Sequence, residues 1–252
     1  MIQLINLSKH YGKLAAVDNL NLEVAPGEIF GFLGPNGAGK TTTIRCMMGI
    51  LKSTSGQVLL DGHDVVANAL KAKAISGFIP DRPFIYEKLS GREFLHFVGK
   101  LHRVDSAQLS KRIAELLESL EMTPWQDELV ESYSHGMKQR LVVCGALIHE
   151  PKILVVDEPM VGMDPKGART LKDLFRALAK TGTTVFLSTH SIAVAEEICH
   201  RIGIIRAGRL IACGSMSEIH AQTDGDGKGN LESAFLELTR EQDMAVPAAQ
   251  AL

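Results

Sequence analysis

Apolar and polar positions recur along the chain in two ways, and each predicts a different element. Short apolar runs bounded by Pro, Gly or Asp are typical of strands, whereas apolar residues three or four positions apart indicate one face of a helix. The runs predict strands at residues 2–7, 17–24, 29–33, 57–60, 75–79, 153–156, 184–187 and 202–205. Helical spacing predicts helices at 43–50, 94–101, 109–120, 137–149, 167–180 and 192–199. Strands that alternate with helices favour an α/β fold with a mostly parallel sheet and helices on both faces.

One part of the chain, from about residue 84 to residue 149, is predicted to be a helical subdomain. Its last helix, at 137–149, is apolar on most sides and must therefore be largely buried. We interpret this region as an insertion into an α/β domain that spans residues 1–222. The remainder divides by composition into a flexible linker at 223–230, a short amphipathic helix at 231–243 and a loose tail at 244–252.

Composition narrows the classes of function. The chain has 252 residues, of which 45% are hydrophobic, and a formal net charge of −2. A protein that binds nucleic acid through its phosphates needs a basic surface, so no nucleic-acid partner is expected. No apolar run approaches the roughly 18 residues of a membrane span, and the first residues do not resemble a signal peptide. Widely spaced cysteines predict buried, reduced thiols, and we expect a cytoplasmic location. These cysteines are Cys46, Cys144, Cys199 and Cys213.

The strongest chemical signal is a glycine-rich segment between the strand at 29–33 and the helix at 43–50. It consists of Gly34, Pro35, Asn36, Gly37, Ala38, Gly39, Lys40, Thr41 and Thr42. Glycines let the backbone turn tightly, so that N–H groups point inward and form an anion site before the positive end of the following helix. Lys40 can reach the outer phosphates of a nucleotide, and the Thr41 hydroxyl can bind Mg²⁺. A purely structural turn would explain the glycines, but not Lys40 followed by Thr41.

Two acids, Asp157 and Glu158, follow the apolar strand at 153–156. In open α/β sheets, ligands bind at the carboxyl ends of the strands. Solvated acids also end many strands, so this pair alone does not decide between a structural and a catalytic role. Together with the phosphate loop, it favours Mg²⁺ coordination by Asp157 and a general base at Glu158.

A second anion site is predicted where the helix at 137–149 begins. Ser134 precedes this helix as an N-cap, and Gly136 permits a ligand to approach the amides of the first turn. An ordinary cap would have the same residues. Its place shortly before the acidic strand is what favours a functional role.

Together these segments resemble the ATP-binding-cassette family, specifically the nucleotide-binding subunits of membrane transporters. The resemblance extends from Tyr11 to about Leu238 and rests on five motifs in the family's order. They are the phosphate loop at 34–42, the signature at 133–137, the acids at 157–158, the loop at 162–165 and the switch histidine in Ser188-Thr189-His190. The resemblance implies a P-loop NTPase core with a mostly parallel sheet, an N-terminal antiparallel β subdomain and the helical insertion.

The resemblance also implies an ATPase that uses ATP and Mg²⁺ and works as a head-to-tail homodimer or pseudo-dimer. Each ATP would lie between the phosphate loop of one chain and Ser134 and Gly136 of the other. Tyr11 would stack on adenine, and His190 would contact the γ-phosphate. The implied partner is an integral membrane permease on a separate chain, which would hold this subunit at the inner face of the cell membrane.

Two other functions stay open: a soluble cassette ATPase that acts on a non-membrane target, and a nucleotide-sensing regulator. The first is disfavoured because translation-type relatives carry two cassettes and repair-type relatives carry long coiled coils, whereas this chain has one cassette and no heptads. Glu158 argues against the second, because a site that no longer hydrolyses ATP would be expected to lose its base first.

Two departures from the family pattern point to one branch of it. The usual signature is LSGGQ, where residues 133–137 read YSHGM. Glutamine is usual after the strand at 75–79, where this chain has Asp81, which becomes a candidate for contact with Mg²⁺. Glutamate at that position and signatures of the SxGM type are found in a branch resembling drug, lipid or antibiotic exporters. The expected function is therefore ATP-driven export.

Aromatic residues gather where the helical insertion begins. Phe94 and Phe97 stand at helical spacing and are predicted to lie in the core, whereas Phe84 and Tyr86 are predicted to form an exposed apolar patch in a loop. By resemblance, this is the region where the family receives a coupling helix of the permease.

Overall fold

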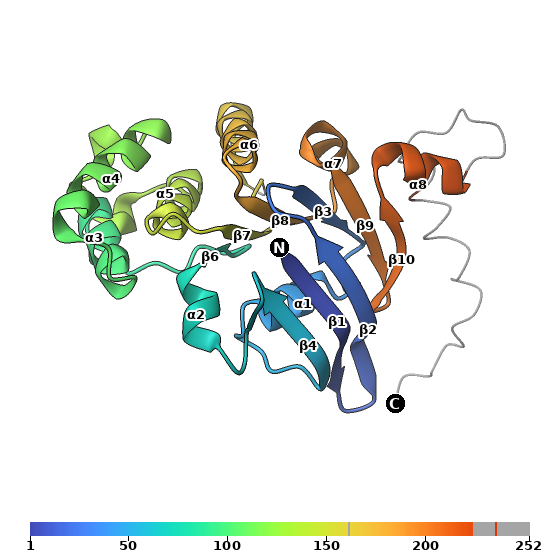
Figure 1. Ribbon diagram of the computed structural model, residues 1–252. Coiled ribbons are helices and arrows are strands. Elements are labelled where there is room, and N and C mark those ends of the chain that lie inside the picture. Colours follow the sequence, from blue (N-terminus) through green and yellow to red (C-terminus); the bar gives the residue numbers. More distant parts are fainter. Residues whose placement is uncertain (161, 224–234, 236–252) are drawn as a thin grey trace, which may run out of the picture.

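The computed structural model describes residues 1–160, 162–223 and 235 (Figure 1). The linker predicted at 223–230, the helix at 231–243 and the tail at 244–252 lie outside the described residues, except for Thr223 and Phe235. Thr223 ends helix α8. The description below concerns the two long ranges.

Six strands form the larger sheet, in the order β10-β9-β3-β8-β7-β6. All neighbours are parallel except β10, which is antiparallel to β9. The strands are β3 (Ile29–Leu33), β6 (Ser76–Ile79), β7 (Ile153–Asp157), β8 (Thr184–Thr189), β9 (Arg201–Arg206) and β10 (Arg209–Gly214). Every residue of β3, β7 and β8 is buried, because both faces of the sheet are covered.

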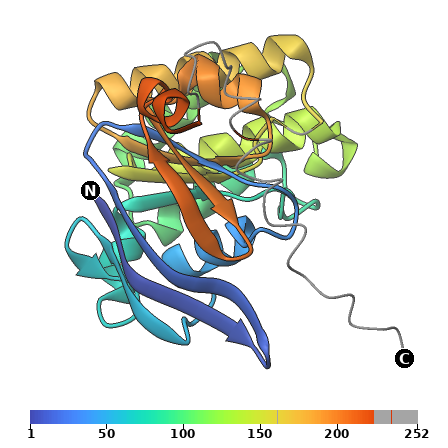
Figure 2. The same ribbon diagram turned by 90° about the vertical axis from the view of Figure 1, so that its right-hand side faces the viewer.

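A four-stranded antiparallel sheet covers one face of the larger sheet. Its order is β2-β1-β4-β5, from β1 (Ile2–Tyr11), β2 (Leu14–Val24), β4 (Ser55–Leu60) and β5 (His63–Asp64). Helix α1 (Lys40–Met47) lies between the two sheets, and Ile44 and Met47 are fully buried there with Phe30 and Phe32 of β3 (Figure 2). This arrangement confirms the predicted antiparallel β subdomain.

Helices cover the opposite face of the larger sheet (Figure 1). They include α5 (His135–Leu147), α6 (Pro165–Lys180) and α7 (Ile192–Ile198). Asp164 caps α6 by accepting a hydrogen bond from the Gly167 N–H, and the helix buries Leu171 and Phe175 against the sheet. Two further helices, α2 (Ala69–Ala74) and α8 (Met216–Thr223), lie at the periphery.

The region between β6 and β7 is helical. It contains α3 (Gly91–Leu101), α4 (Ser106–Ser119), two single-turn helices at Thr123–Trp125 and Val130–Ser132, and α5. Ser90 and Glu93 form a reciprocal capping box at the start of α3, and the Asp105 carboxylate caps α4. Leu95 and Leu117 are fully buried where these helices pack together. The predicted helical insertion is confirmed as part of the fold.

The predicted strands are present, and several extend beyond their predicted ends. β5, β10, α2 and α8 were missed because they are short or peripheral and show little periodicity. One prediction about the core is wrong: Phe94 is buried, but Phe97 is 39% exposed and packs edge-on against Tyr86, with ring centroids 5.3 Å apart. Phe97 therefore belongs to the surface of α3, although it shares the helical spacing of Phe94.

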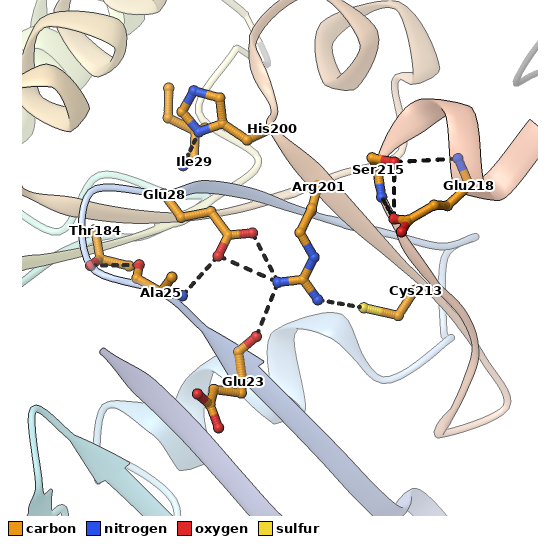
Figure 3. Close-up of polar contacts among 10 residues, drawn as sticks. All are labelled: Glu23, Ala25, Glu28, Ile29, Thr184, His200, Arg201, Cys213, Ser215 and Glu218. Carbon is orange, nitrogen blue, oxygen red and sulfur yellow. Dashed lines mark hydrogen bonds and ion pairs between the residues drawn. The ribbon is translucent and has the colours of Figure 1, made fainter.

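An ion pair between the buried Glu28 and the partly exposed Arg201 joins β9 to the turn before β3 at the amino ends of these strands (Figure 3). The Glu28 carboxylate accepts hydrogen bonds from the Ala25 N–H at 2.7 Å and from Arg201 at 3.1 and 3.4 Å. Arg201 also donates to the Glu23 carbonyl and to Cys213 Sγ. Nearby, the Ile29 N–H donates to His200 Nδ1 at 2.9 Å. These contacts fix the end of the sheet that lies opposite the phosphate loop.

Candidate nucleotide-binding and hydrolysis site

The phosphate loop connects β3 to α1, and its glycines are required by the surrounding structure. A Cβ on Gly34 would lie 2.4 Å from the Ile205 carbonyl oxygen, and one on Gly39 would lie 2.4 Å from that of Ala16. Gly39 has φ +108° and Gly37 has φ +80°, backbone conformations that favour glycine. The loop is therefore packed closely against β2 and β9, as a rigid cradle requires.

The start of α1 can accept an anion. Its N-cap is Gly39, which provides no side-chain acceptor, and the first turn contains no acidic residue. The first N–H groups of a helix have no partner within the helix, so this end attracts negative charge. The ligand class that fits is a phosphate.

Lys40 is the first residue of α1, and its side chain is almost fully buried. Its ammonium group donates hydrogen bonds to the carbonyls of Gly34 at 2.7 Å and Pro35 at 3.3 Å. It also forms an ion pair with Glu158, with Nζ and Oε1 3.5 Å apart. The phosphate loop and the acidic end of β7 therefore meet at Lys40.

A cleft of about 620 Å³ opens over the loop. It extends from Tyr11 at the end of β1 to Glu158 and Asp81 after β7 and β6. The other lining residues are Leu14, Ala15, Ala16, Pro35, Asn36, Gly37, Gly39, Lys40, Thr41, Thr42, Ala207 and Gly208. Tyr11 is 49% exposed, so its ring is accessible to a ligand. Residues 14–16 and 207–208 are lining residues that the sequence analysis did not identify; they become recognisable only when β2 and β9 are placed beside the loop.

Glu158 has an unusual backbone and a crowded side chain. Its φ is +48°, in the left-handed region that non-glycine residues seldom occupy. One carboxylate oxygen faces Lys40, and the other is 2.9 Å from His190 Nδ1. The left-handed turn thus aims the carboxylate into the cleft between a cation of the phosphate loop and the histidine that follows β8.

Asp157, the last residue of β7, is buried beside this group. Burial raises the pKa of its carboxyl group, and the nearby acids Asp81 and Glu158 act in the same direction. Hydrogen bonds from the hydroxyl groups of Ser188 and Thr41 oppose this rise in the pKa. The structure therefore places Thr41, Asp81 and Asp157 close together.

These oxygen donors fit Mg²⁺, which prefers carboxylate, hydroxyl and phosphate oxygens and retains several of its waters. Within the described ranges, no group of three or more His, Cys, Asp or Glu side chains forms a complete metal site. Mg²⁺ is commonly bound through one or two carboxylates together with substrate phosphates. A bound cation would also offset the burial, and then the repulsion by Asp81 and Glu158, that raise the pKa of Asp157.

The signature residues lie elsewhere. Ser134 caps α5 by accepting a hydrogen bond from the Met137 N–H, and its side chain is exposed. A Cβ added at Gly136 would meet no atom within 4 Å. Among the described residues, those that line the cleft include neither Ser134 nor Gly136. One copy of the chain does not bring them to its own phosphate loop.

Comparison with known proteins identifies this arrangement. The model of the family described as ABC transporter matches residues 17–161, which is more than half of the chain. The chain belongs to the ABC transporter family. It is an ATP-binding subunit and an ATPase, and subunits of this family dimerise and partner with transmembrane components. No helix within the described ranges combines the length and apolar character that crossing a bilayer requires.

Individual relatives agree with this assignment. The chain is 39% identical over 218 residues to the daunorubicin resistance ATP-binding protein DrrA3 of Streptomyces coeruleorubidus, a match that covers 86% of this chain and 69% of the relative. It is 37% identical over 226 residues to the linearmycin resistance ATP-binding protein LnrL of Bacillus subtilis (strain 168), covering 90% and 73%. A solved structure of an ATP-binding subunit of an ABC transporter superimposes with a TM-score of 0.90 at 28% identity, covering 95% of this chain and all of that one.

Proposed function

We propose that this ABC ATPase powers an exporter, as one of two ATP-hydrolysing subunits bound to a separate integral membrane permease at the inner face of the cell membrane. Two similar relatives are named for resistance to daunorubicin and to linearmycin, which favours export of an antibiotic-like compound. The main support for hydrolysis is the position of Glu158, which lines the cleft and lies between Lys40 and His190.

The proposed reaction assigns each of these side chains a separate task. Glu158 takes a proton from the attacking water as that oxygen bonds to the γ-phosphorus, and the bond to the β–γ bridging oxygen breaks to leave ADP. Lys40 neutralises the outer phosphates, and His190 orients Glu158 and contacts the γ-phosphate. Tyr11 stacks on the adenine ring.

The remaining polar residues hold the nucleotide and its cation. The phosphate loop, Gly34 to Thr42, surrounds the phosphates with N–H groups. Thr41, Asp157 and Asp81 would hold Mg²⁺, which supplies charge neutralisation at the phosphates. Ser134 and Gly136 of a second copy, or of a related subunit, would close the site from the other side.

The permease is proposed to dock on an apolar groove beside the helical region. The groove has a volume of about 360 Å³, and its lining includes Phe84, Phe94 and Val98. Phe84 is 90% exposed and Tyr86 56% exposed, and Tyr86 stacks edge-on with Phe97. Exposed aromatic side chains grouped in this way are typical of an interaction surface.

Glu158→Gln tests the hydrolytic part of the proposal. The amide keeps the shape of the side chain but cannot accept the proton of water, so ATP stays bound and the dimer persists. We expect turnover to fall at least about 100-fold, while gel filtration with ATP shows a stable dimer. Hydrolysis close to the wild-type rate would show that Glu158 is not the base.

In the same assay, Ser134→Arg should lower turnover without weakening nucleotide binding by the monomer.

Co-purification from membranes tests the partner. A tagged chain should recover an integral membrane protein, and Phe84→Asp or Tyr86→Asp should prevent its recovery, because docking would bury an unpaired carboxylate. The matched control is Trp125→Asp, which changes an exposed aromatic residue that belongs neither to the groove nor to the Tyr86–Phe97 pair. Survival of the complex in both the Phe84 and the Tyr86 variant would place the docking surface elsewhere.

A further inference from the structure

Ser188 lies two residues before the switch histidine, on the strand next to the one that ends in the two acids. It contacts both of these acids. It is fully buried near the carboxyl end of β8. Its Oγ lies 2.5 Å from Asp157 Oδ1 and 3.2 Å from the backbone nitrogen of Glu158. The same nitrogen lies 3.2 Å from the Ser188 carbonyl oxygen.

The chemistry of these groups fixes the direction of each hydrogen bond. A carboxylate only accepts, so the single hydroxyl proton of Ser188 is donated to Asp157. The backbone N–H of Glu158 only donates, so it bonds to a lone pair of the same hydroxyl oxygen. One hydroxyl group therefore holds the carboxylate of Asp157 and the peptide that begins the left-handed turn at Glu158.

Residues at the carboxyl end of β8 thus hold the two acids that follow from β7 in position. Ser188 holds Asp157 and the backbone of Glu158, while His190 contacts the carboxylate of Glu158 at 2.9 Å. The two strands are paired in parallel, with Asp157 beside Ser188. This register places the serine level with the two acids.

We propose that Ser188 is a positioning residue for ATP hydrolysis, which sets the Asp157 carboxylate for the metal and the Glu158 turn for the attacking water. The inference rests on the roles proposed above for Asp157 and Glu158. Groups that orient a metal ligand from behind typically change metal affinity or activity by about 10- to 100-fold when removed. Loss of the Ser188 hydroxyl should therefore weaken metal binding selectively.

A second buried hydroxyl on β8 provides the control. Thr184 is 1% exposed and donates to the Ala25 carbonyl at 3.2 Å, at the amino end of the strand and away from the acids. If buried hydroxyls of β8 serve only to stabilise the fold, Ser188→Ala and Thr184→Val should behave alike. If Ser188 positions the acids, only Ser188→Ala should alter the site.

The experiment measures Mn²⁺ affinity by electron paramagnetic resonance, using the full-length chain saturated with a non-hydrolysable ATP analogue. For Ser188→Ala we expect affinity to fall by about 10-fold or more, with ATPase turnover falling in parallel. The affinity for the analogue in EDTA should be unchanged. Thr184→Val should keep the Mn²⁺ affinity of the wild type, even where its melting temperature falls.

Further variants make each failure distinguishable. Asp157→Ala must itself lose Mn²⁺ affinity; if it does not, the proposed metal site is wrong. If Asp157→Ala loses Mn²⁺ affinity but Ser188→Ala retains it, the role of Ser188 alone is overturned. Should Ser188→Ala fail to fold, Ser188→Cys replaces it. A thiol is a weak donor, so its Mn²⁺ affinity must fall below that of the wild type, and an unchanged value would overturn the inference.

Discussion

The larger sheet has a glutamate beside a cationic side chain at the amino ends of its strands and another at the carboxyl ends. The two glutamates differ in how closely their carboxylates are hydrogen-bonded. At the amino end, Glu28 is 8% exposed and accepts hydrogen bonds from Ala25 and Arg201. At the carboxyl end, Glu158 faces Lys40 at 3.5 Å, a distance longer than a good hydrogen bond. Lys40 directs its shorter bonds to carbonyls of its own loop.

This difference separates a structural pair from a pair that a ligand can displace. Arg201 donates hydrogen bonds to Glu28, to the Glu23 carbonyl and to Cys213 Sγ. Of the partners that Figure 3 joins to the Glu28 carboxylate, only the Ala25 N–H would remain without Arg201. Lys40 can transfer its charge to a phosphate, and Glu158 still has His190 as a neighbour. The two pairs are chemically similar, but their other partners differ, and the predictions below test whether one is structural and the other binds a ligand.

Removing the cation at the carboxyl end should have the largest effect on function. Lys40→Ala removes charge-assisted hydrogen bonds to the outer phosphates, so we expect ATP affinity to fall by about 100-fold or more, equivalent to roughly 3 kcal/mol. Fluorescence titration with a labelled ATP analogue would measure this. An unchanged affinity would contradict the phosphate-loop assignment.

The equivalent change at the amino end should affect stability instead. Arg201→Ala leaves Glu28 buried without its cation, and we expect the free energy of unfolding to fall by about 2 kcal/mol. This is below the 3–5 kcal/mol of a fully buried pair because Arg201 is 39% exposed. Urea denaturation measures the loss, and ATP affinity of the folded protein should be unchanged.

A matched exposed pair gives the scale for that result. Arg209 pairs with Asp18, but its side chain is 72% exposed. Arg209→Ala should therefore cost less than about 1 kcal/mol. Equal losses in the free energy of unfolding for Arg201→Ala and Arg209→Ala would show that the burial of Glu28 does not strengthen its ion pair.

Most of the fold was predictable because its central strands are buried on both faces. β3, residues 153–156 of β7 and residues 185–187 of β8 are apolar runs, and α6 has a clear apolar face. β10 and α8 were not predicted because they are short and few of their apolar residues, such as Ala212 and Ile219, are buried, so the sequence pattern is weak. Phe97 was misplaced because spacing identifies a helical face but not where the covering elements end.

The candidate site was predictable in its residue types but not in its geometry. The residues of the phosphate loop are consecutive in sequence, and its glycines predict the turn. The left-handed backbone of Glu158 and the double contact of Ser188 depend on β7 lying beside β8, which no local pattern reveals. The available signal for Ser188 was its position directly after the apolar residues 185–187 and two residues before His190.

The amino end of the sheet also contains a titratable group whose effect should appear as acid sensitivity. His149 contacts the Ser76 carbonyl at the start of β6 and stacks on His102, with ring centroids 3.6 Å apart. Burial, and then the neighbouring His102, lower the pKa of His149 to about 4. Its neutral form is therefore favoured in the folded protein.

The sign of the pH effect follows from that lowered pKa. Above the ordinary pKa of 6.5, His149 is neutral in both states and costs nothing. As pH falls from 6.5 towards 4, only the unfolded state takes up the proton, so stability is lost through this window. Compared with His149→Gln, the wild type should lose about 1–2 kcal/mol more between pH 7 and pH 4. Parallel curves would contradict the lowered pKa.

One predicted change in stability separates the two ends of the sheet most clearly, because its sign is reversed. Asp157 is buried near Asp81 and Glu158, and burial and these acids raise its pKa, so its charge opposes folding in the absence of a cation. Asp157→Asn removes that charge and keeps an oxygen that can accept the proton of Ser188. We expect the metal-free protein to gain about 1 kcal/mol of stability while ATP hydrolysis is lost, as when a strained active site is relaxed. At the other end, Glu28→Gln should lose stability, since Glu28 is the fully paired carboxylate. Thermal denaturation of both variants in EDTA measures the pair of changes, and destabilisation by Asp157→Asn would mean that its carboxylate is as well compensated as that of Glu28.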